Sequence, residues 1–262
     1  MFEINKLDNA VEVILQRPPV NALSDAWILA FHQVLDVIEQ MDALSVVHFR
    51  SGLELFSAGA DLKEIEQRLT MPPEEMVRYN RSLHTLFNRI EDLDCVTLCE
   101  INGLAFGGGF ELTLACDLRI AANEAMLGLP EARLGLIPGA GGTQRLTRIA
   151  GLGVANMIIL GCEVVDGEEA RRLGMVQWSC PKEDLPGKAR EIRQRIAALA
   201  PPALSVSKRC IKAYLTEGTD GFEMEIEAQR ELIVSDEAKS RVRAFVDERR
   251  KRSESKKAGT SG

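Results

Sequence analysis

The amino-acid sequence predicts an α/β protein with a largely parallel sheet and a helical C-terminal region. Strand patterns alternate with helical patterns over the first 182 residues, whereas only amphipathic helical patterns follow from residue 183 onward. The chain has 262 residues, 45% of them hydrophobic, so it is long enough to bury a sizeable core. We therefore expect one main domain with a smaller helical appendage.

The first fifty residues carry the pattern of one β-α-β crossover. The alternation in VEVIL (11–15) predicts a strand, and the preceding LDNA suits a hairpin turn. Ser24 is a favourable N-cap for a helix whose apolar residues recur at helical spacing as far as Met41. VVHFR (46–50) then predicts the next strand, parallel to the one before the helix.

A second unit of the same kind follows. It contains the loop FSAGAD (56–61), a helix from about Pro73 to Asp92 and the strand CVTLCEI (95–101). A glycine turn then leads into another helix near residue 109, and DLRIAA (117–122) predicts a further strand. These elements predict helices packed over a mainly parallel sheet.

Four amphipathic segments make up the C-terminal part, at residues 184–199, 203–217, 220–234 and 236–250. The final SESKKAGTSG is small and polar, which predicts disorder. We accordingly assign residues 1–182 to a core, 183–250 to a helical region and 251–262 to a disordered tail.

Composition excludes several classes of function. The net charge of -7 gives no basic field for a polyanion, so we expect no nucleic-acid partner. The six cysteines lack CxxC spacing and the three histidines are remote from them in sequence, which predicts free thiols and no metal site. No segment has the length of a membrane span or the pattern of a signal peptide, so we expect a cytoplasmic protein without membrane contact.

The stretch AFGGGFE (105–111) places three glycines directly before a carboxylate. At a strand-to-helix turn the first amide groups have no partner within the helix, and glycine lets a ligand approach them. The SAGAD loop also follows a strand, so its amides can converge with these on one oxygen, as in an oxyanion hole for a thioester carbonyl. Neither nucleotide-binding glycine motif is present. The alternative is close packing of a helix on a strand, with no ligand.

Two glutamates are candidates for acid-base chemistry. Glu111 is in the first turn of the expected helix with apolar residues after it, and Glu131 follows a proline in GLPEARLGLIPGAGGTQRL (128–146). Two carboxyl groups in apolar surroundings can hold one water and differ in protonation. The alternatives are a glutamate that only complements the helix dipole and a surface turn at Glu131.

At these motifs the sequence resembles the crotonase superfamily, and within it the enoyl-CoA hydratases. The resemblance covers nearly the whole chain. The motifs that carry it are RPPVNALS (17–24), FSAGADLKE (56–64), INGLAFGGGFELTLACDLRIA (101–121), GLPEARLGLIPGAGGTQRL and DEAKSRVRAFVDER (236–249). It implies a crotonase-like spiral of repeated β-β-α turns and a C-terminal region that forms homotrimers or hexamers. It also implies an acyl-CoA thioester substrate with no separate cofactor.

The resemblance assigns roles to particular residues. The oxyanion donors fall on the amides of Ala60 and Gly108, Glu111 activates water for attack at C3, and Glu131 gives a proton to C2. Retention of both glutamates favours 2-enoyl-CoA hydration, with an isomerase or decarboxylase as the alternative. Further substrate contacts are implied at Ala22, Ala58, Asp61, Leu62, Gly107, Pro130 and Gly139.

The chain departs from many relatives in one respect, because ERRKRSESKK contains no aromatic residue to reach the CoA of a neighbouring subunit. The basic residues 249–252 either meet CoA phosphates or form a solvated helix end. An RNA-binding relative is disfavoured because DAWILAFHQVLDVIEQ contains no lysine or arginine, and a non-catalytic scaffold is disfavoured by the two glutamates. Residues 63–90 show no pattern that predicts the length, branching or charge of the acyl group.

Overall fold

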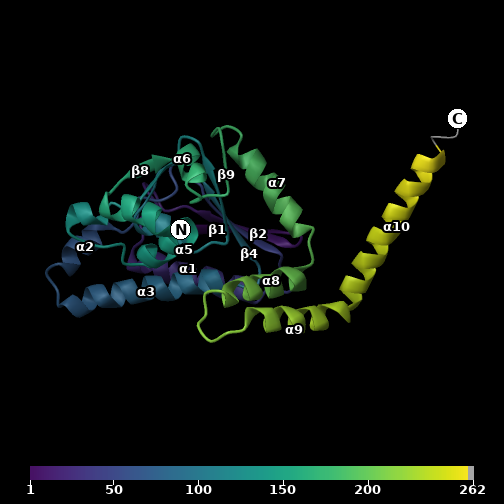
Figure 1. Cartoon of the computed structure of the whole chain (residues 1–262). Coiled ribbons are helices and arrows are strands. Elements are labelled where there is room, and N and C mark those ends of the chain that lie inside the picture. The colour runs from purple at the N-terminus through teal and green to yellow at the C-terminus, as the bar shows by residue number, and fades with distance from the viewer. Residues whose placement is uncertain (259–262) are drawn as a thin grey trace. The chain divides into compact units, whose positions relative to one another are not determined.

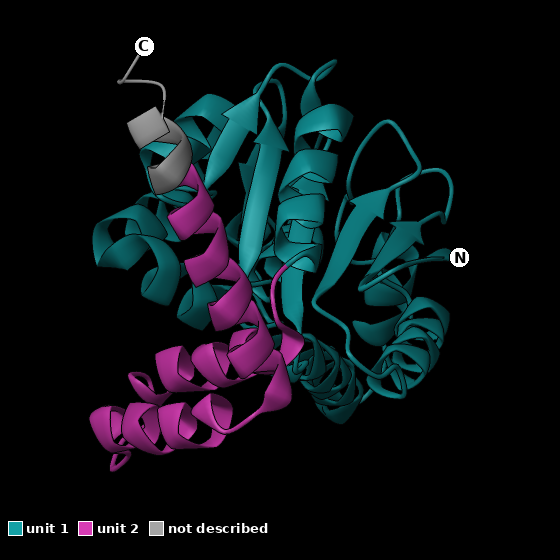
Figure 2. Ribbon diagram, turned by 90° about the vertical axis from the view of Figure 1, so that its right-hand side faces the viewer, with its two compact units in different colours: residues 1–198 teal, residues 199–262 magenta. Residues whose placement is uncertain are grey.

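The computed structural model describes the backbone of residues 1–258 and the side chains as far as residue 252. It divides into two compact units, Met1–Ala198 and Leu199–Gly262 (Figure 2). The expected boundary at 182/183 differs from this division. The reason is that helix α7 (Leu185–Ala197) packs on the strands of the first unit and belongs to it.

A six-stranded sheet forms the centre of the first unit, and its strands are parallel except for the antiparallel pair β1 and β2. The expectation of a largely parallel sheet is therefore confirmed. In spatial order the strands are β1 (Phe2–Leu7), β2 (Ala10–Leu15), β3 (Val46–Ser51), β4 (Val96–Ile101), β6 (Leu118–Ala122) and β9 (Trp178–Cys180).

A second, three-stranded sheet was not predicted from the sequence. It consists of β5 (Ala105–Phe106), β7 (Met126–Gly128) and β8 (Val164–Asp166), with β5 parallel and β8 antiparallel to β7. Strands of two or three residues are too short to show an alternating pattern, which explains why sequence periodicity did not reveal them. This sheet carries the glycine turn, because β5 ends one residue before Gly107.

Helices of the first unit cover the sheet, and α1 and α3 pack against each other (Figure 1). The side chain of Ser24 caps α1 as expected, accepting a hydrogen bond from the amide of Trp27. Trp27 and Phe31 of α1 pack with Phe49 of β3 in the fully buried core. The helices besides α7 are α1 (Asp25–Glu39), α2 (Leu62–Arg68), α3 (Pro73–Asp92), α4 (Gly108–Leu114), α5 (Gly142–Ala155) and α6 (Gly167–Arg172), with a 3-10 turn at Glu131–Leu134 and a π turn at Asn156–Leu160.

The second unit contains the helices α8 (Pro201–Ala213), α9 (Gly221–Ile233) and α10 (Asp236–Ala258). Helix α10 continues past residue 250, so the expected disorder does not describe residues 251–258, and residues 259–262 lie outside the described part. The guanidinium of Arg249 lies 5.2 Å from the ring centre of Phe245, on its own helix. No helix in residues 1–258 combines the length and apolarity that crossing a membrane requires.

Candidate active site

The glycine turn after β5 brings the backbone of three residues against other groups. Gly107 has φ +50°, a conformation that favours glycine, and its amide donates to the carbonyl of Gly128 at 3.1 Å. A Cβ on Gly109 would lie 2.6 Å from the carbonyl oxygen of Ser57, so this glycine permits close packing. The packing alternative thus accounts for Gly109, whereas Gly108 lines a cavity and needs another explanation.

Gly108 and Ala60 present their amides at the same place. A Cβ on Gly108 would lie 3.8 Å from the Ala60 nitrogen, and one on Gly59 would lie 3.3 Å from the Gly108 nitrogen. Neither the Ala60 amide nor the Gly108 amide donates a hydrogen bond within the described chain. The loop before α2 is fixed by Leu23, whose amide donates to the Gly59 carbonyl. Two unpartnered amides on adjoining loops have the arrangement of a donor pair for an oxyanion.

Glu111 lies on α4, one turn beyond this donor pair, and is 2% exposed. Its Oε1 accepts hydrogen bonds from the amides of Ala140 at 2.8 Å and Gly142 at 2.7 Å. Burial and the nearby charge of Glu131 raise the pKa of Glu111 to about 7, although the two amides and Arg145 act in the opposite direction. A carboxyl group with this pKa is able to exchange a proton near neutral pH.

The loop that holds Glu111 is itself held by Arg145 of α5. The Arg145 side chain is 5% exposed, and its Nη1 donates to the Ala140 carbonyl at 2.9 Å. Its Nη2 donates to Asn88 at 2.7 Å and to Glu91 at 2.9 Å, both on α3. Arg145 therefore ties the amides that bind Glu111 to the helix packed beside them.

Glu131 is the first residue of the 3-10 turn, and its carboxyl group lies next to the glycine turn. A Cβ on Gly107 would lie 2.9 Å from Glu131 Oε1, so the carboxyl group lies directly against that backbone. Its buried Oε2 has no hydrogen-bond partner among the described residues, and burial raises the pKa of Glu131. An unpartnered buried oxygen beside Glu111 is suited to a water molecule or a substrate proton.

One cavity of about 480 Å³ brings these groups together. Its remaining wall is mostly apolar, which suits the acyl part of a ligand. The residues singled out from the sequence that line it are Ala58, Ala60, Leu62, Gly107, Gly108, Glu111, Pro130, Glu131 and Gly139.

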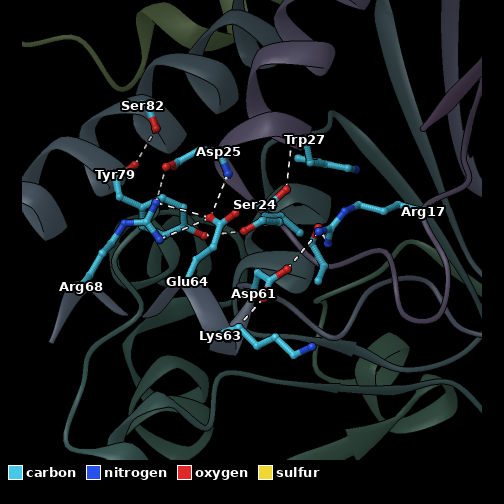
Figure 3. A network of polar contacts seen from close by, with 12 residues as sticks. Arg17, Ser24, Asp25, Trp27, Asp61, Lys63, Glu64, Arg68, Tyr79 and Ser82 are labelled. Carbon is cyan, nitrogen blue, oxygen red and sulfur yellow. Dashed lines mark hydrogen bonds and ion pairs between the residues drawn. The ribbon is translucent and has the colours of Figure 1, made fainter. Parts of the chain in front are cut away.

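Ala22 and Asp61 are not in the cavity wall. Both are engaged by Arg17, which donates to the Ala22 carbonyl at 2.8 Å. Arg17 also donates to Asp61 Oδ2 at 3.0 Å (Figure 3). Hydrogen bonding from Arg17 lowers the pKa of Asp61, and Asp61 also caps α2 through the amide of Lys63. Arg17 therefore joins the segment before α1 to the loop before α2.

A polar network joins α2 to α3, two helices that contribute residues to the cavity wall (Figure 3). The guanidinium of Arg68, on α2, is paired with Asp25 and Glu64 and lies 4.3 Å from the ring centre of Tyr79. The Tyr79 hydroxyl donates to the Leu23 carbonyl at 2.8 Å, on the segment that pairs with Ala60. Tyr79 thus both lines the cavity and steadies the loop that carries one donor amide.

Sequence reasoning missed much of the acyl wall. The missed residues of α3 recur at helical spacing, so the sequence does indicate that they share one face of the helix. It does not indicate which other elements that face meets. The missed lining residues are Ile65, Met76, Tyr79, Asn80, Leu83, Phe106, Leu134, Gly135, Leu136, Ile137 and Ala140. Arg145, buried outside the wall, was also missed, since a single arginine in a helix gives no sequence signal of its role.

A family model described as "Enoyl-CoA hydratase/isomerase" matches residues 6–256. This chain belongs to the enoyl-CoA hydratase/isomerase family. The family implies acyl-CoA substrates, and the crotonase fold expected from the sequence is confirmed by the solved structures that this family member resembles.

Relatives of this family member cover almost its whole length. It is 32% identical over 250 residues to a short-chain-enoyl-CoA hydratase of Clostridium acetobutylicum, with 94% of this chain and 95% of the relative covered. It is 36% identical over 255 residues to a probable mitochondrial enoyl-CoA hydratase 2 of Arabidopsis thaliana, covering 95% and 84%. A crystal structure of enoyl-CoA hydratase from Bacillus anthracis aligns with TM-score 0.88 at 35% identity, covering 94% and 96%.

The described residues contain no group of three or more histidine, cysteine, aspartate or glutamate side chains placed to hold a metal. The cavity offers two carboxyl groups with raised pKa values and two free amides. Such a set can stabilise an enolate oxygen and move protons at neighbouring carbons.

Proposed function

We propose that this enzyme is a 2-enoyl-CoA hydratase, which adds water reversibly across the 2,3 double bond of an acyl thioester. The observation that carries the proposal is the placement of Glu111 and Glu131 on one cavity, beside the two unpartnered amides of Ala60 and Gly108. One carboxyl group alone would serve proton transfer at a single carbon. Two of them match an addition that delivers hydroxide to one carbon and a proton to the next.

In the proposed reaction the thioester oxygen accepts hydrogen bonds from the amides of Ala60 and Gly108. Ionised Glu111 removes a proton from water, whose oxygen forms a bond to C3 while the electrons of the double bond shift toward the thioester. The two amides stabilise the enolate oxygen that results, by about 3 kcal/mol for each donor. Glu131 in its acid form then gives its proton to C2, which completes the 3-hydroxyacyl-CoA.

The electrostatics of the cavity support this division of roles. The two amide donors bind Glu111 Oε1 and favour its ionised form, whereas Glu131 Oε2 has no donor within the described chain to stabilise a charge. Like charges at close range oppose simultaneous ionisation, and Glu131 is one of the causes of the raised pKa of Glu111. The two amides thus support Glu111 as the base, and a charge on either carboxyl group favours the acid form of the other.

The proposal extends to assembly and location. We propose a homotrimer or hexamer, supported by the large apolar side chains that residues 199–252 leave exposed, and a cytoplasmic enzyme that needs no separate cofactor. Contact between the basic residues 249–252 and CoA phosphates stays a proposal, with Arg252 paired to Glu248 in this structure.

A substrate panel tests the activity directly. Purified enzyme is incubated with crotonyl-CoA, longer and branched 2-enoyl-CoAs and 3-methylglutaconyl-CoA, and the products are identified by mass spectrometry in deuterated and ordinary water. We expect a 3-hydroxyacyl-CoA with one solvent hydrogen at C2. A 3-enoyl-CoA or a decarboxylated product, with no hydration of any member, would assign the chain to the isomerases or decarboxylases of its family instead.

A further inference from the structure

The first unit contains a second cavity, of about 600 Å³, that shares no lining residue with the catalytic one. Its walls come from β1, β2, β3, β4 and the helix α7. Unlike the catalytic cavity it is lined mainly by ionisable side chains. The proposed reaction uses none of them.

Three ionisable residues from neighbouring strands line this cavity where apolar residues are expected. Glu12 and His48 are direct partners in the register of β2 and β3, and Glu100 follows on β4. The His48 side chain is 2% exposed and the Glu100 side chain 7% exposed, within strands whose other residues are mostly apolar. Burying such groups in a sheet costs stability unless they are paired, so their presence calls for a reason.

Pairing with arginines satisfies the carboxyl group of Glu12. Glu12 accepts hydrogen bonds from Arg50 and, at 2.8 Å, from Arg193 Nη1. Although burial acts in the opposite direction, hydrogen bonds and charge from Arg50 lower the pKa of Glu12, so it is ionised at neutral pH. His48 Nε2 lies 3.1 Å from Glu100 Oε2, but the two atoms are not aligned for a hydrogen bond. The buried Nε2 therefore has no hydrogen-bond partner in the described chain.

Positive charge remains in excess around this cavity. Four cationic side chains line it against the two carboxylates, which leaves two positive charges when His48 is neutral. Arg50 and Arg193 are engaged by Glu12, whereas Lys6 and Arg190 are exposed and form no ion pair with described residues. An uncompensated pair of cations at the mouth of a polar cavity attracts an anion.

We propose that this second cavity binds a small dianion of the phosphate type. Its charge matches the excess of two, and guanidinium groups present several donors in a geometry that suits phosphoryl oxygens. Lys6 and Arg190 supply the free charges, and Arg193 presents its guanidinium from the same helix as Arg190. The ligand would join the N-terminal hairpin to α7, because its contacts come from both. This inference does not depend on the proposed hydratase activity.

Inorganic phosphate is the probe for this site. Thermal unfolding of the full chain is followed as phosphate is added, against sodium chloride at matched ionic strength, and calorimetry gives the dissociation constant. At about ten times that constant we expect the melting temperature to rise by about 2–4 °C. In the variant Lys6→Ala/Arg190→Ala we expect binding at least about tenfold weaker, because hydrogen bonds to charged groups are lost. Both residues are exposed, so the variant retains the fold.

Lys188→Ala is the matched control, since Lys188 is exposed on α7, is paired with Glu191 and does not line the cavity. Its phosphate affinity must equal that of the unaltered enzyme. Phosphate that stabilises no more than chloride, or a double variant that binds as tightly as the control, would overturn the proposal. The second result would place the anion elsewhere, for instance in the catalytic cavity. Crotonyl-CoA turnover in all three proteins tests the hydratase proposal separately.

Discussion

The two units differ in how far they bury their apolar side chains. Residues 1–198 bury a continuous core with fully enclosed Trp27, Phe31 and Phe110, whereas in residues 199–252 Ala213 is the one buried side chain described. The second unit leaves Tyr214 92% and Phe222 81% exposed. Exposed apolar surface of this extent marks an interaction surface in soluble proteins.

We infer from this difference that the first unit carries the chemistry and the second unit the proposed assembly. Both glutamates, both donor amides and the cavity belong to the first unit, whose core fixes their positions. The second unit contributes helices whose large apolar side chains are exposed among the described residues. Substitutions at the cavity in the first unit should therefore change turnover without changing subunit association. Substitutions of exposed apolar residues in the second unit should weaken association.

The largest effect is expected at the two glutamates. Glu111→Gln and Glu131→Gln keep size and hydrogen bonding but remove proton transfer, so each should lower kcat for crotonyl-CoA hydration at least about a hundredfold. The double variant should be little worse than the poorer single one, because both groups act on one reaction. Steady-state kinetics and the affinity for acyl-CoA are measured, and affinity should change little.

Sedimentation of these variants should match that of the unaltered enzyme, which checks that assembly is independent of the catalytic pair. Near-normal hydration by Glu131→Gln would defeat the two-carboxylate mechanism. Isomerase activity that survives in the same variant would favour the alternative reaction class.

A contrast between adjacent glycines separates the site from its scaffold. A Cβ on Gly108 meets the tip of the flexible Leu23 side chain at 3.0 Å, so Gly108→Val should fold but lose about 10² in kcat by obstructing the donor pair. Gly109→Ala instead meets the backbone of Ser57 at 2.6 Å and should lower the melting temperature. Equal losses of stability and activity in Gly108→Val would favour the packing explanation.

A smaller effect is expected on association. If residues 199–252 form the assembly surface, Phe222→Ser should weaken subunit association at least about tenfold, as loss of a buried aromatic anchor does. Analytical ultracentrifugation over a range of concentrations measures it, with Glu231→Ala on the same helix as the control. A single mass for all three proteins at every concentration would show that Phe222 is not at an interface.

The smallest expected effect is a shift of the pH profile. Arg145 lowers the pKa of Glu111, so Arg145→Gln should raise that pKa further above its value of about 7. The base must be ionised, so hydration increases as pH rises through this pKa, and the acid limb should move to higher pH by up to about one unit. Turnover at pH 7 would then fall about fivefold.

Arg145→Lys keeps the positive charge and should leave the acid limb of kcat/KM in place. Because Glu111 and Glu131 interact, the pKa measured from the acid limb belongs to the pair of carboxyl groups rather than to Glu111 alone. If Arg145→Gln lowers activity equally at all pH values, Arg145 acts only as a structural support of the loop.

Several features of the fold were predictable because they depend on local physics. Ser24 before an apolar helical face predicted the start of α1, and the pattern from Pro73 to Asp92 predicted α3. The short strands β5, β7 and β8 were not predictable, since pairing rather than periodicity makes them strands. The assignment of α7 to the first unit likewise depends on which surface its apolar face meets.

By itself the sequence determined the family, the order of the long elements and the residue types of the site, because these follow from local patterns and motifs. Only the tertiary structure decided that Glu111 and Glu131 line one cavity and that Asp61 binds Arg17 instead of lining it. It also decided that Arg145 binds the loop whose amides donate to Glu111. The pKa of a carboxyl group depends on its burial and on charges that are distant in sequence. A linear pattern specifies none of these neighbours, because packing of the whole first unit brings them together.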